Sequence, residues 1–299
     1  MQTRGMNPVT TLTPEQIAQF RADGFLALPS ITTPAEVAQL RGIFDRLFAE
    51  GAGWKKGAQF DLAGTDESQR PALPQILNPV EFAPELRATQ FRQNALAIAR
   101  QLLGADAEPW FEHAILKPPR YGAATPWHQD EAHRDDPGVT YEQLSVWLPL
   151  QEATVANGCM RFIARSHLGP VLPHHSPGDD PRVTALECVG GFAPADAIPC
   201  PLPAGGATIH HCRTLHAAGP NGSDLPRRAY ILAFRSAVRP DTAFRGYPWN
   251  GEKHTAAQAR HTAWQNRGGP LGRASRAALN AAAGLLARVR GKAARLLRK

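Results

Sequence analysis

The run Leu-Ser-Val-Trp-Leu-Pro-Leu at residues 144–150 is short, apolar and rich in residues that favour β-structure. Four similar runs occur nearby in the chain, at residues 111–116, 160–163, 207–210 and 229–237. Gly, Pro, Asn and Asp residues separate these runs. Short strands with turn signals between them predict an all-β sandwich or barrel from about residue 110 to 238, and a jelly roll suits a region of this length.

Helices are expected before this β-rich region. Thr13-Pro14-Glu15-Gln16 and Thr33-Pro34-Ala35-Glu36 each place a capping threonine before a proline and end on a residue that can close a capping box. Residues 37–48 and 84–103 carry apolar side chains at helical spacing. Because these helices would brace a β core, the expected fold class is α+β.

The composition is that of an ordinary globular protein. With 299 residues, 43% of them hydrophobic and 20% charged, the sequence is long enough for one large domain with its own core. No apolar run approaches the roughly 18 residues of a membrane span, and residues 1–10 lack the core of a signal peptide. We therefore expect a cytoplasmic protein whose four cysteines are reduced and mostly buried.

The positive charge is concentrated in the C-terminal tail. Lys and Arg number 33 against 26 Asp and Glu, but eight of the basic residues follow residue 272, where no acidic residue occurs. Spaced as a helix, residues 273–299 are apolar on one side and cationic on the other. Such a basic amphipathic helix either docks peripherally on an anionic membrane surface or packs on its own domain or a partner subunit. Nucleic acid is not an expected partner, because the tail lacks aromatic residues for base stacking.

Trp127-His128-Gln129-Asp130 is the segment that carries the chemistry. Residues two apart on a strand point to the same face, so His128 and Asp130 can converge on one ion. Two histidines and one carboxylate on one face of a metal leave its other positions open, which suits Fe(II) oxygenases. His-x-Asp alone is a common pattern, so a third ligand is needed. His210, His211 and His216, in the second histidine-rich segment, are the candidates.

An arginine follows this second segment. Arg227 begins the apolar run that leads to residue 237, and its guanidinium can hold the far end of a dicarboxylate near the metal. Its neighbour Arg228 faces the opposite way on a strand, so only one of the two enters a pocket. Arg161 is a weaker candidate for the same pocket.

Taken in order, these motifs resemble the phytanoyl-CoA dioxygenase family of Fe(II)- and 2-oxoglutarate-dependent oxygenases. The resemblance covers residues 12–234. It includes residues 12–26, Trp127-His128-Gln129-Asp130, the turn Asn157-Gly158-Cys159-Met160, and residues 215–227. It implies a double-stranded β-helix, a cupin-like jelly roll, in a dioxygenase domain over residues 1–250, followed by a C-terminal helical extension over residues 251–299.

Residue by residue, the resemblance implies His128, Asp130 and His216 as the iron ligands, with Arg227 pairing the remote carboxylate of 2-oxoglutarate. Three further positions fall where some family members line the co-substrate pocket: Lys117, Gln129 and Trp147. His133, three residues past Asp130, is expected to face the substrate. The chain departs from the family at Ala218, where many relatives carry a small hydroxyl residue.

The implied activity is hydroxylation of a small organic metabolite, with Fe(II), 2-oxoglutarate and O₂. Asp130 favours hydroxylation over halogenation, because related halogenases lack this carboxylate, while desaturation and ring closure stay open. Two alternatives stand beside it: the same chemistry on a lipid- or envelope-linked substrate, reached by membrane docking of the tail, and a non-catalytic metal-binding or sensor jelly roll. Neither the substrate nor the oligomeric state follows from the sequence.

Overall fold

The computed structural model describes residues 7–67, 70–243 and 246–267, so the basic tail lies outside the described residues. The helices are α1 (Pro14–Asp23), α2 (Pro34–Ala49), α3 (Gln90–Leu103), α4 (Pro248–Gly251) and α5 (Ala256–Asn266). The strands are β1 (Phe25–Leu28), β2 (Gln59–Asp61), β3 (Pro74–Leu77), β4 (Glu108–Lys117), β5 (Thr125–His128), β6 (Val139–Thr140), β7 (Gln143–Pro149), β8 (Met160–Phe162), β9 (His174–His175), β10 (Glu187–Cys188), β11 (Ile198–Cys200), β12 (Ala207–His211), β13 (His216–Ala218), β14 (Arg227–Arg235) and β15 (Arg239–Pro240).

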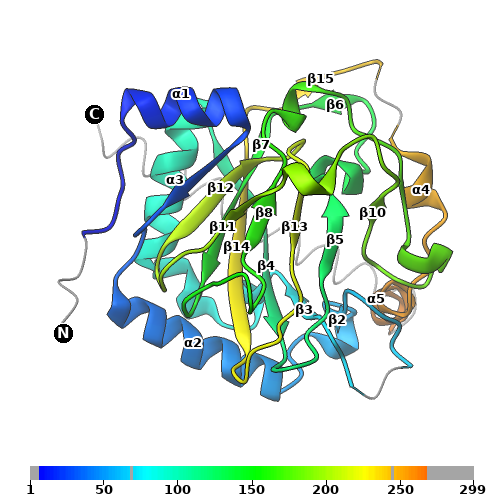
Figure 1. Ribbon diagram of the computed structural model, residues 1–299. Helices are drawn as coiled ribbons and strands as arrows, with labels where there is room; N and C mark the ends of the chain where they lie inside the picture. Colours follow the sequence, from blue (N-terminus) through cyan, green and yellow to red (C-terminus); the bar gives the residue numbers. More distant parts are fainter. Residues whose placement is uncertain (1–6, 68–69, 244–245, 268–299) are drawn as a thin grey trace, which may run out of the picture.

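Two antiparallel sheets form the β core (Figure 1). The large sheet has the order β1-β12-β7-β14-β4-β3-β2, and the small sheet has the order β11-β8-β13-β5. The chain passes repeatedly from one sheet to the other, because β4, β7, β12 and β14 lie in the large sheet, whereas β5, β8, β11 and β13 lie in the small one. The expected α+β class with an antiparallel, cupin-like core is therefore confirmed.

Strand alternation separates two apolar clusters. On β14, Tyr230 and Leu232 face a cluster that includes Phe44 of α2 and Phe91 of α3, while Ile231 belongs to a second cluster with residues of the small sheet. Neighbouring residues on a strand point to opposite faces, so one face of the large sheet packs on helices and the other looks toward the small sheet. The site described below lies on this second side.

Glu36 does not close the capping box expected at the start of α2. Thr33 does accept a hydrogen bond from the Glu36 backbone. The Glu36 carboxylate instead accepts from the backbone N–H groups of Gln90, at 2.5 Å, and Phe91, at 2.7 Å. Those groups open α3, whose N-cap residue makes no side-chain cap of its own. The first N–H groups of a helix have no acceptor within the helix, and here a carboxylate from the neighbouring helix α2 accepts two of them.

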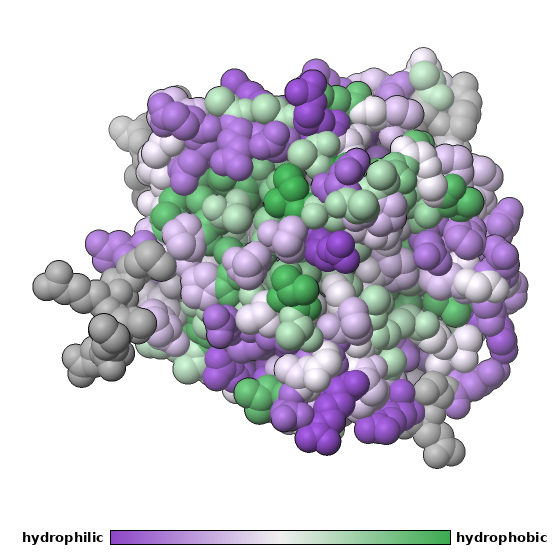
Figure 2. All heavy atoms as spheres, viewed as in Figure 1, coloured by the Kyte–Doolittle hydropathy of each residue, from purple (hydrophilic) through white to green (hydrophobic). Residues whose placement is uncertain are grey.

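The described helices and cysteines agree with two expectations from composition. No described helix combines the length and apolar character needed to cross a membrane. All four cysteines are free and buried, as predicted. On the face shown in Figure 2, hydrophobic side chains are interspersed with hydrophilic ones.

Glu112 on β4 ties α3 to the large sheet. Its side chain is buried, accepts hydrogen bonds from Tyr230 Oη at 2.8 Å and the Val80 backbone at 3.1 Å, and pairs with Arg92. Glu112→Ala should lower the free energy of unfolding by about 3–5 kcal/mol, because it leaves a partly buried cation and a buried hydroxyl without their acceptor. Urea denaturation measures this loss.

Glu108→Ala is the matched control on the same strand. Glu108 is exposed and pairs with Arg235 at 2.8 Å, so its removal should cost less than about 1 kcal/mol. Equal losses for the two variants would show that the Glu112 network contributes no more than a surface ion pair.

Candidate functional site

Strand pairing brings together the three residues that were expected to bind a metal. His128 ends β5 and is the register partner of His216, which begins β13. Asp130 opens the short 3₁₀ helix Asp130–His133, two residues past the end of the strand. The turn nevertheless directs its carboxylate toward both rings. Oδ1 of Asp130 lies 3.6 Å from Nε2 of His128 and 3.4 Å from Nε2 of His216.

Hydrogen bonds at the far side of each ring fix which nitrogen faces inward. Nδ1 of His128 donates to the carbonyl oxygen of Pro126 at 2.8 Å, and Nδ1 of His216 donates to that of Thr214 at 2.8 Å. A carbonyl only accepts, so each Nδ1 carries the hydrogen and each Nε2 keeps a free lone pair. In the described part of the chain, these two histidines and Asp130 have ligand atoms within 4.8 Å of one another. That donor set fits a divalent metal ion.

Electrostatics favour the forms that bind metals. Burial lowers the pKa of His128 well below its usual value, so the ring is neutral. Burial alone would raise the pKa of Asp130, but the surrounding histidines, His216 foremost, hold it well below its ordinary range. The site therefore presents a carboxylate at Asp130 and a neutral imidazole at His128, which are the forms that metal binding requires.

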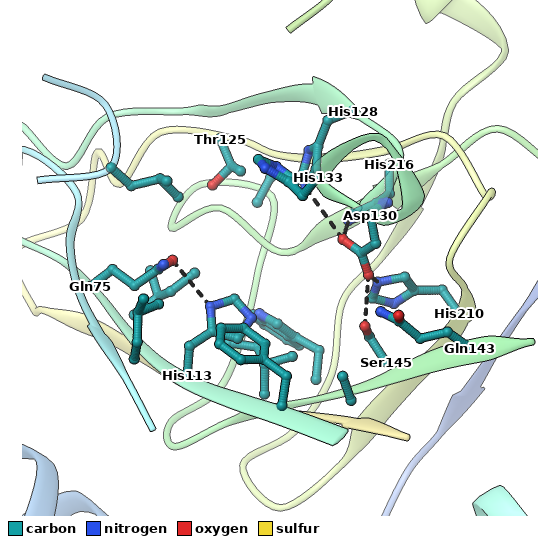
Figure 3. Close-up of a pocket in the computed structure, with 18 of the residues that line it drawn as sticks. Gln75, His113, Thr125, His128, Asp130, His133, Gln143, Ser145, His210 and His216 are labelled. Atoms are coloured by element: carbon teal, nitrogen blue, oxygen red, sulfur yellow. Dashed lines mark hydrogen bonds and ion pairs between the residues drawn. The ribbon is translucent and has the colours of Figure 1, made fainter. Parts of the chain in front are cut away.

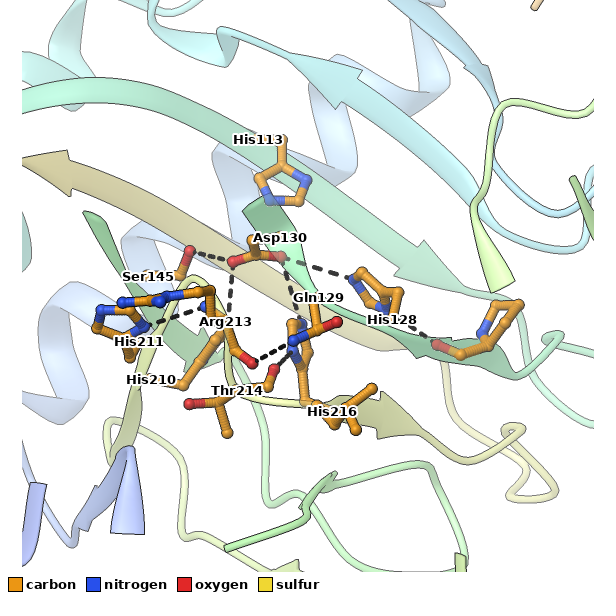
Figure 4. A network of polar contacts seen from close by, with 12 residues as sticks. His113, His128, Gln129, Asp130, Ser145, His210, His211, Arg213, Thr214 and His216 are labelled. Carbon is orange, nitrogen blue, oxygen red and sulfur yellow. Dashed lines mark hydrogen bonds and ion pairs between the residues drawn. The ribbon is translucent and has the colours of Figure 1, made fainter. Parts of the chain in front are cut away.

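The second oxygen of Asp130 contacts two side chains whose roles here the sequence did not predict. Ser145 Oγ on β7 donates to Oδ2 at 2.7 Å, and Nε2 of His210 on β12 lies 3.3 Å from the same oxygen (Figure 4). His210, an alternative third ligand, thus lies behind the carboxylate. The other alternative, His211, pairs with Glu142 at 2.7 Å. Ser145 and His210 lie side by side because β7 pairs with β12, and no sequence motif predicted that pairing.

A cavity of about 480 Å³ opens in front of this group. In Figure 3, His128, His133, Asp130 and His216 lie on one side of it, and Gln75 and His113 lie on the other. His133 lines the cavity, and its ring lies 6.1 Å from that of His128. His113 and Gln75 were not among the predicted site residues.

Arg227 reaches the same cavity from the start of β14. Its side chain is only 1% exposed, yet Nε and Nη1 have no hydrogen-bond partner among the described residues. Its guanidinium lies 5.4 Å from the ring centre of Trp147, which also lines the cavity. Burial disfavours the charged guanidinium and lowers the pKa of Arg227. A bound anion would therefore offset the free-energy cost of burying this charge.

Comparison with known proteins identifies the family of this chain. A family profile described as "Phytanoyl-CoA dioxygenase (PhyH)" matches residues 20–229, more than two thirds of the chain. The chain belongs to the phytanoyl-CoA dioxygenase family. It is an enzyme, a 2-oxoglutarate-dependent dioxygenase that uses Fe(II), 2-oxoglutarate and O₂.

Individual relatives span most of the chain. A solved structure of EvdO2 from Micromonospora carbonacea var. aurantiaca is 42% identical, has a TM-score of 0.70, and covers 82% of this chain and 99% of its own. EvdO2 has also been solved with 2-oxoglutarate, at 39% identity and a TM-score of 0.69. A probable alpha-ketoglutarate-dependent hypophosphite dioxygenase of Stutzerimonas stutzeri is 25% identical over 229 residues, 75% of this chain and 78% of that protein.

Two residues assigned to the co-substrate pocket by analogy with the family lie elsewhere. Lys117 Nζ donates to the carbonyl oxygens of Ala218, at 3.1 Å, and Gly219, at 2.6 Å. The Gln129 amide bonds to the backbone of Arg213 and Leu172. Neither side chain is among the residues that line the cavity. Gln129 lies between two inward-facing residues, so its side chain turns to the other side of the segment.

The two other arginines considered from the sequence also lie outside the cavity lining. Arg228 pairs with Asp45 on the helix side of β14, as strand alternation predicts. The Arg161 guanidinium lies 5.8 Å from the ring centre of Trp127. Of the three arginines considered from the sequence, Arg227 is the one that lines the cavity with the candidate metal group.

Proposed function

We propose that this dioxygenase hydroxylates a small organic molecule, with Fe(II) on His128, Asp130 and His216 and the remote carboxylate of 2-oxoglutarate on Arg227. One observation carries the proposal: three converging ligand atoms share a cavity with a buried guanidinium that lacks a partner. Relatives named for hypophosphite and for ectoine share about a quarter of the aligned residues. Their names support the reaction class for this chain, but they do not indicate its substrate.

Each residue has a defined task. The histidines and Asp130 would hold iron on one face and leave the other face open to the co-substrate and O₂. Iron and 2-oxoglutarate together supply the oxidising power when bound, because protein side chains cannot activate O₂ in this way. Arg227 would neutralise and orient the co-substrate, Trp147 would pack beside it, and the buried walls would exclude water.

We also propose that the two sheets form a complete double-stranded β-helix braced by the N-terminal helices. The alternation of strands between the sheets supports this, as does the packing of α2 and α3 on the large sheet. The division into a dioxygenase domain over residues 1–250 and an extension over residues 251–299 remains part of the proposal. Within that extension, α5 contacts the short helix Trp54–Lys56.

Ser145 is expected to position Asp130. Ser145→Ala removes the hydroxyl that holds Oδ2, so the carboxylate gains freedom to turn away from the histidines. Loss of such an outer-shell partner should weaken Fe(II) binding roughly ten- to a hundredfold. Competition with a colorimetric chelator under anaerobic conditions measures the affinity without relying on turnover.

Thr208→Val is the matched control, because Thr208 carries a buried hydroxyl on the neighbouring strand β12. That hydroxyl has no hydrogen-bond partner among the described residues. Its loss should leave Fe(II) affinity unchanged. Equal affinities in the Ser145 and Thr208 variants would remove the positioning role.

A screen of candidate metabolites tests the proposed function. Protein loaded with Fe(II) and 2-oxoglutarate should release succinate faster when a substrate is present, and the product should gain one oxygen atom from O₂. Mass spectrometry after reaction under ¹⁸O₂ detects that atom. A product that is halogenated, desaturated or cyclised without gaining oxygen would contradict hydroxylation.

A further inference from the structure

The cavity wall facing the metal group is largely hydrocarbon. Side chains from β2, β3, β4 and β14, and from the residue after β2, supply most of it: Phe60, Leu62, Leu77, Ile115, Ile231 and Ala233. On these strands the polar or charged lining residues are Gln75, His113 and Arg227. Ligand sites of this kind bind a carbon skeleton through apolar contact and orient it through a small number of hydrogen bonds.

The charges around the cavity do not favour an anionic substrate. Two arginines are among the described lining residues, and Arg227 is taken by the co-substrate in the proposed function. The other, Arg134, donates to Asp136 Oδ1 at 2.7 Å and lies 4.0 Å from the ring centre of Tyr141. Asp135 beside it is an exposed carboxylate with no ion pair in the described residues. A phosphate or carboxylate entering here would lose water without meeting a free cation.

His113 is the polar group best placed to orient a substrate. Its Nδ1 lies 3.1 Å from Oε1 of the buried Gln75, and its ring edge is turned toward Asp130 (Figures 3 and 4). Burial lowers the pKa of His113 to about 4, so the ring is neutral near pH 7. With the hydrogen on Nδ1 donated to Gln75, Nε2 is left as a hydrogen-bond acceptor. An acceptor in an otherwise apolar wall selects a ligand that carries a donor.

We propose that the substrate is an uncharged organic molecule with an apolar skeleton and a hydroxyl group that donates a hydrogen bond to Nε2 of His113. This inference rests on the proposed function of the same cavity. His113 would hold the hydroxyl on one side while the iron ligands face the skeleton from the other. His113 is then a specificity-determining residue for the reaction.

Three probes with one skeleton test this class: cyclohexanol, methoxycyclohexane and cyclohexyl phosphate. Each is titrated anaerobically into protein loaded with Fe(II) and 2-oxoglutarate, and broadening of its NMR signals by the paramagnetic iron is measured against Zn(II)-loaded protein. Cyclohexanol should bind about three- to tenfold more tightly than the ether, which lacks the donor. Cyclohexyl phosphate should bind more weakly than either. Tighter binding of the phosphate, or equal binding of alcohol and ether, would overturn the proposal.

His113→Phe should abolish the preference for alcohol over ether while iron and 2-oxoglutarate still give their visible absorption band. If that variant does not fold, Gln75→Leu serves instead, because loss of the Nδ1 acceptor frees the ring hydrogen to occupy Nε2. A preference that survives in the folded variants would also overturn the proposal. A wild-type protein that forms the band but prefers the phosphate refutes this inference alone, whereas absence of the band refutes the proposed function as well.

Discussion

Replacing Asp130 with alanine is expected to abolish 2-oxoglutarate turnover by iron-loaded protein. Among the described residues, Oδ1 is the only anionic ligand atom between the Nε2 atoms of His128 and His216, and Oδ2 is the acceptor for Ser145. The variant retains two imidazoles, which bind a divalent ion far less well than a site that includes a carboxylate. Succinate release and bound iron should fall together, and both are measured on the same purified sample.

Asp196→Ala provides the matched control for this variant. Asp196 is an exposed aspartate in the short 3₁₀ helix Pro194–Asp196, so its removal should change neither iron content nor turnover. Full turnover in iron-loaded Asp130→Ala would dismiss the ligand assignment. Loss of activity in both variants would instead point to unspecific damage by the substitution.

Replacing Arg227 with methionine is expected to weaken 2-oxoglutarate binding by about two to three orders of magnitude. A buried guanidinium whose Nε and Nη1 lack partners can donate charge-assisted hydrogen bonds to a carboxylate, and each such bond contributes about 1.5–3 kcal/mol. Without 2-oxoglutarate the variant should melt no lower than the wild type, because a buried unpaired cation is itself unfavourable. Thermal melting with and without 2-oxoglutarate separates the two effects.

Arg228→Met is the control on the neighbouring residue. It removes the ion pair with Asp45 on the other side of β14 and should cost less than about 1 kcal/mol of stability. Its affinity for 2-oxoglutarate should match that of the wild type. If Arg228→Met weakened 2-oxoglutarate binding as much as Arg227→Met does, the assignment of Arg227 would be wrong.

The sequence predicted those parts of the molecule that local patterns determine. Strand-length apolar runs bounded by turns indicated the β core. The spacing of His128 and Asp130 indicated two side chains that would meet, and the family resemblance implied His216 as the third. Strand alternation correctly separated Arg227 from Arg228. These features depend on residues close together in the chain or on a motif with a fixed order.

The same sequence patterns could not predict contacts between distant segments. Ser145 and His210 reach Asp130 only because β7 pairs with β12. Likewise, His113 meets Gln75 only because β3 pairs with β4. Lys117 illustrates the same limit: its position in the chain suggested the pocket, but its ammonium group is committed to two backbone carbonyls.

Anaerobic titration of Fe(II) and then 2-oxoglutarate into the purified full-length protein tests the central assignment most directly. We expect a weak visible charge-transfer band that saturates at one iron and one co-substrate per chain. The band should be lost in His128→Ala and His216→Ala, and should require far more 2-oxoglutarate in Arg227→Met. A band of undiminished strength in both histidine variants, or no band in the wild type at saturation, would contradict the account.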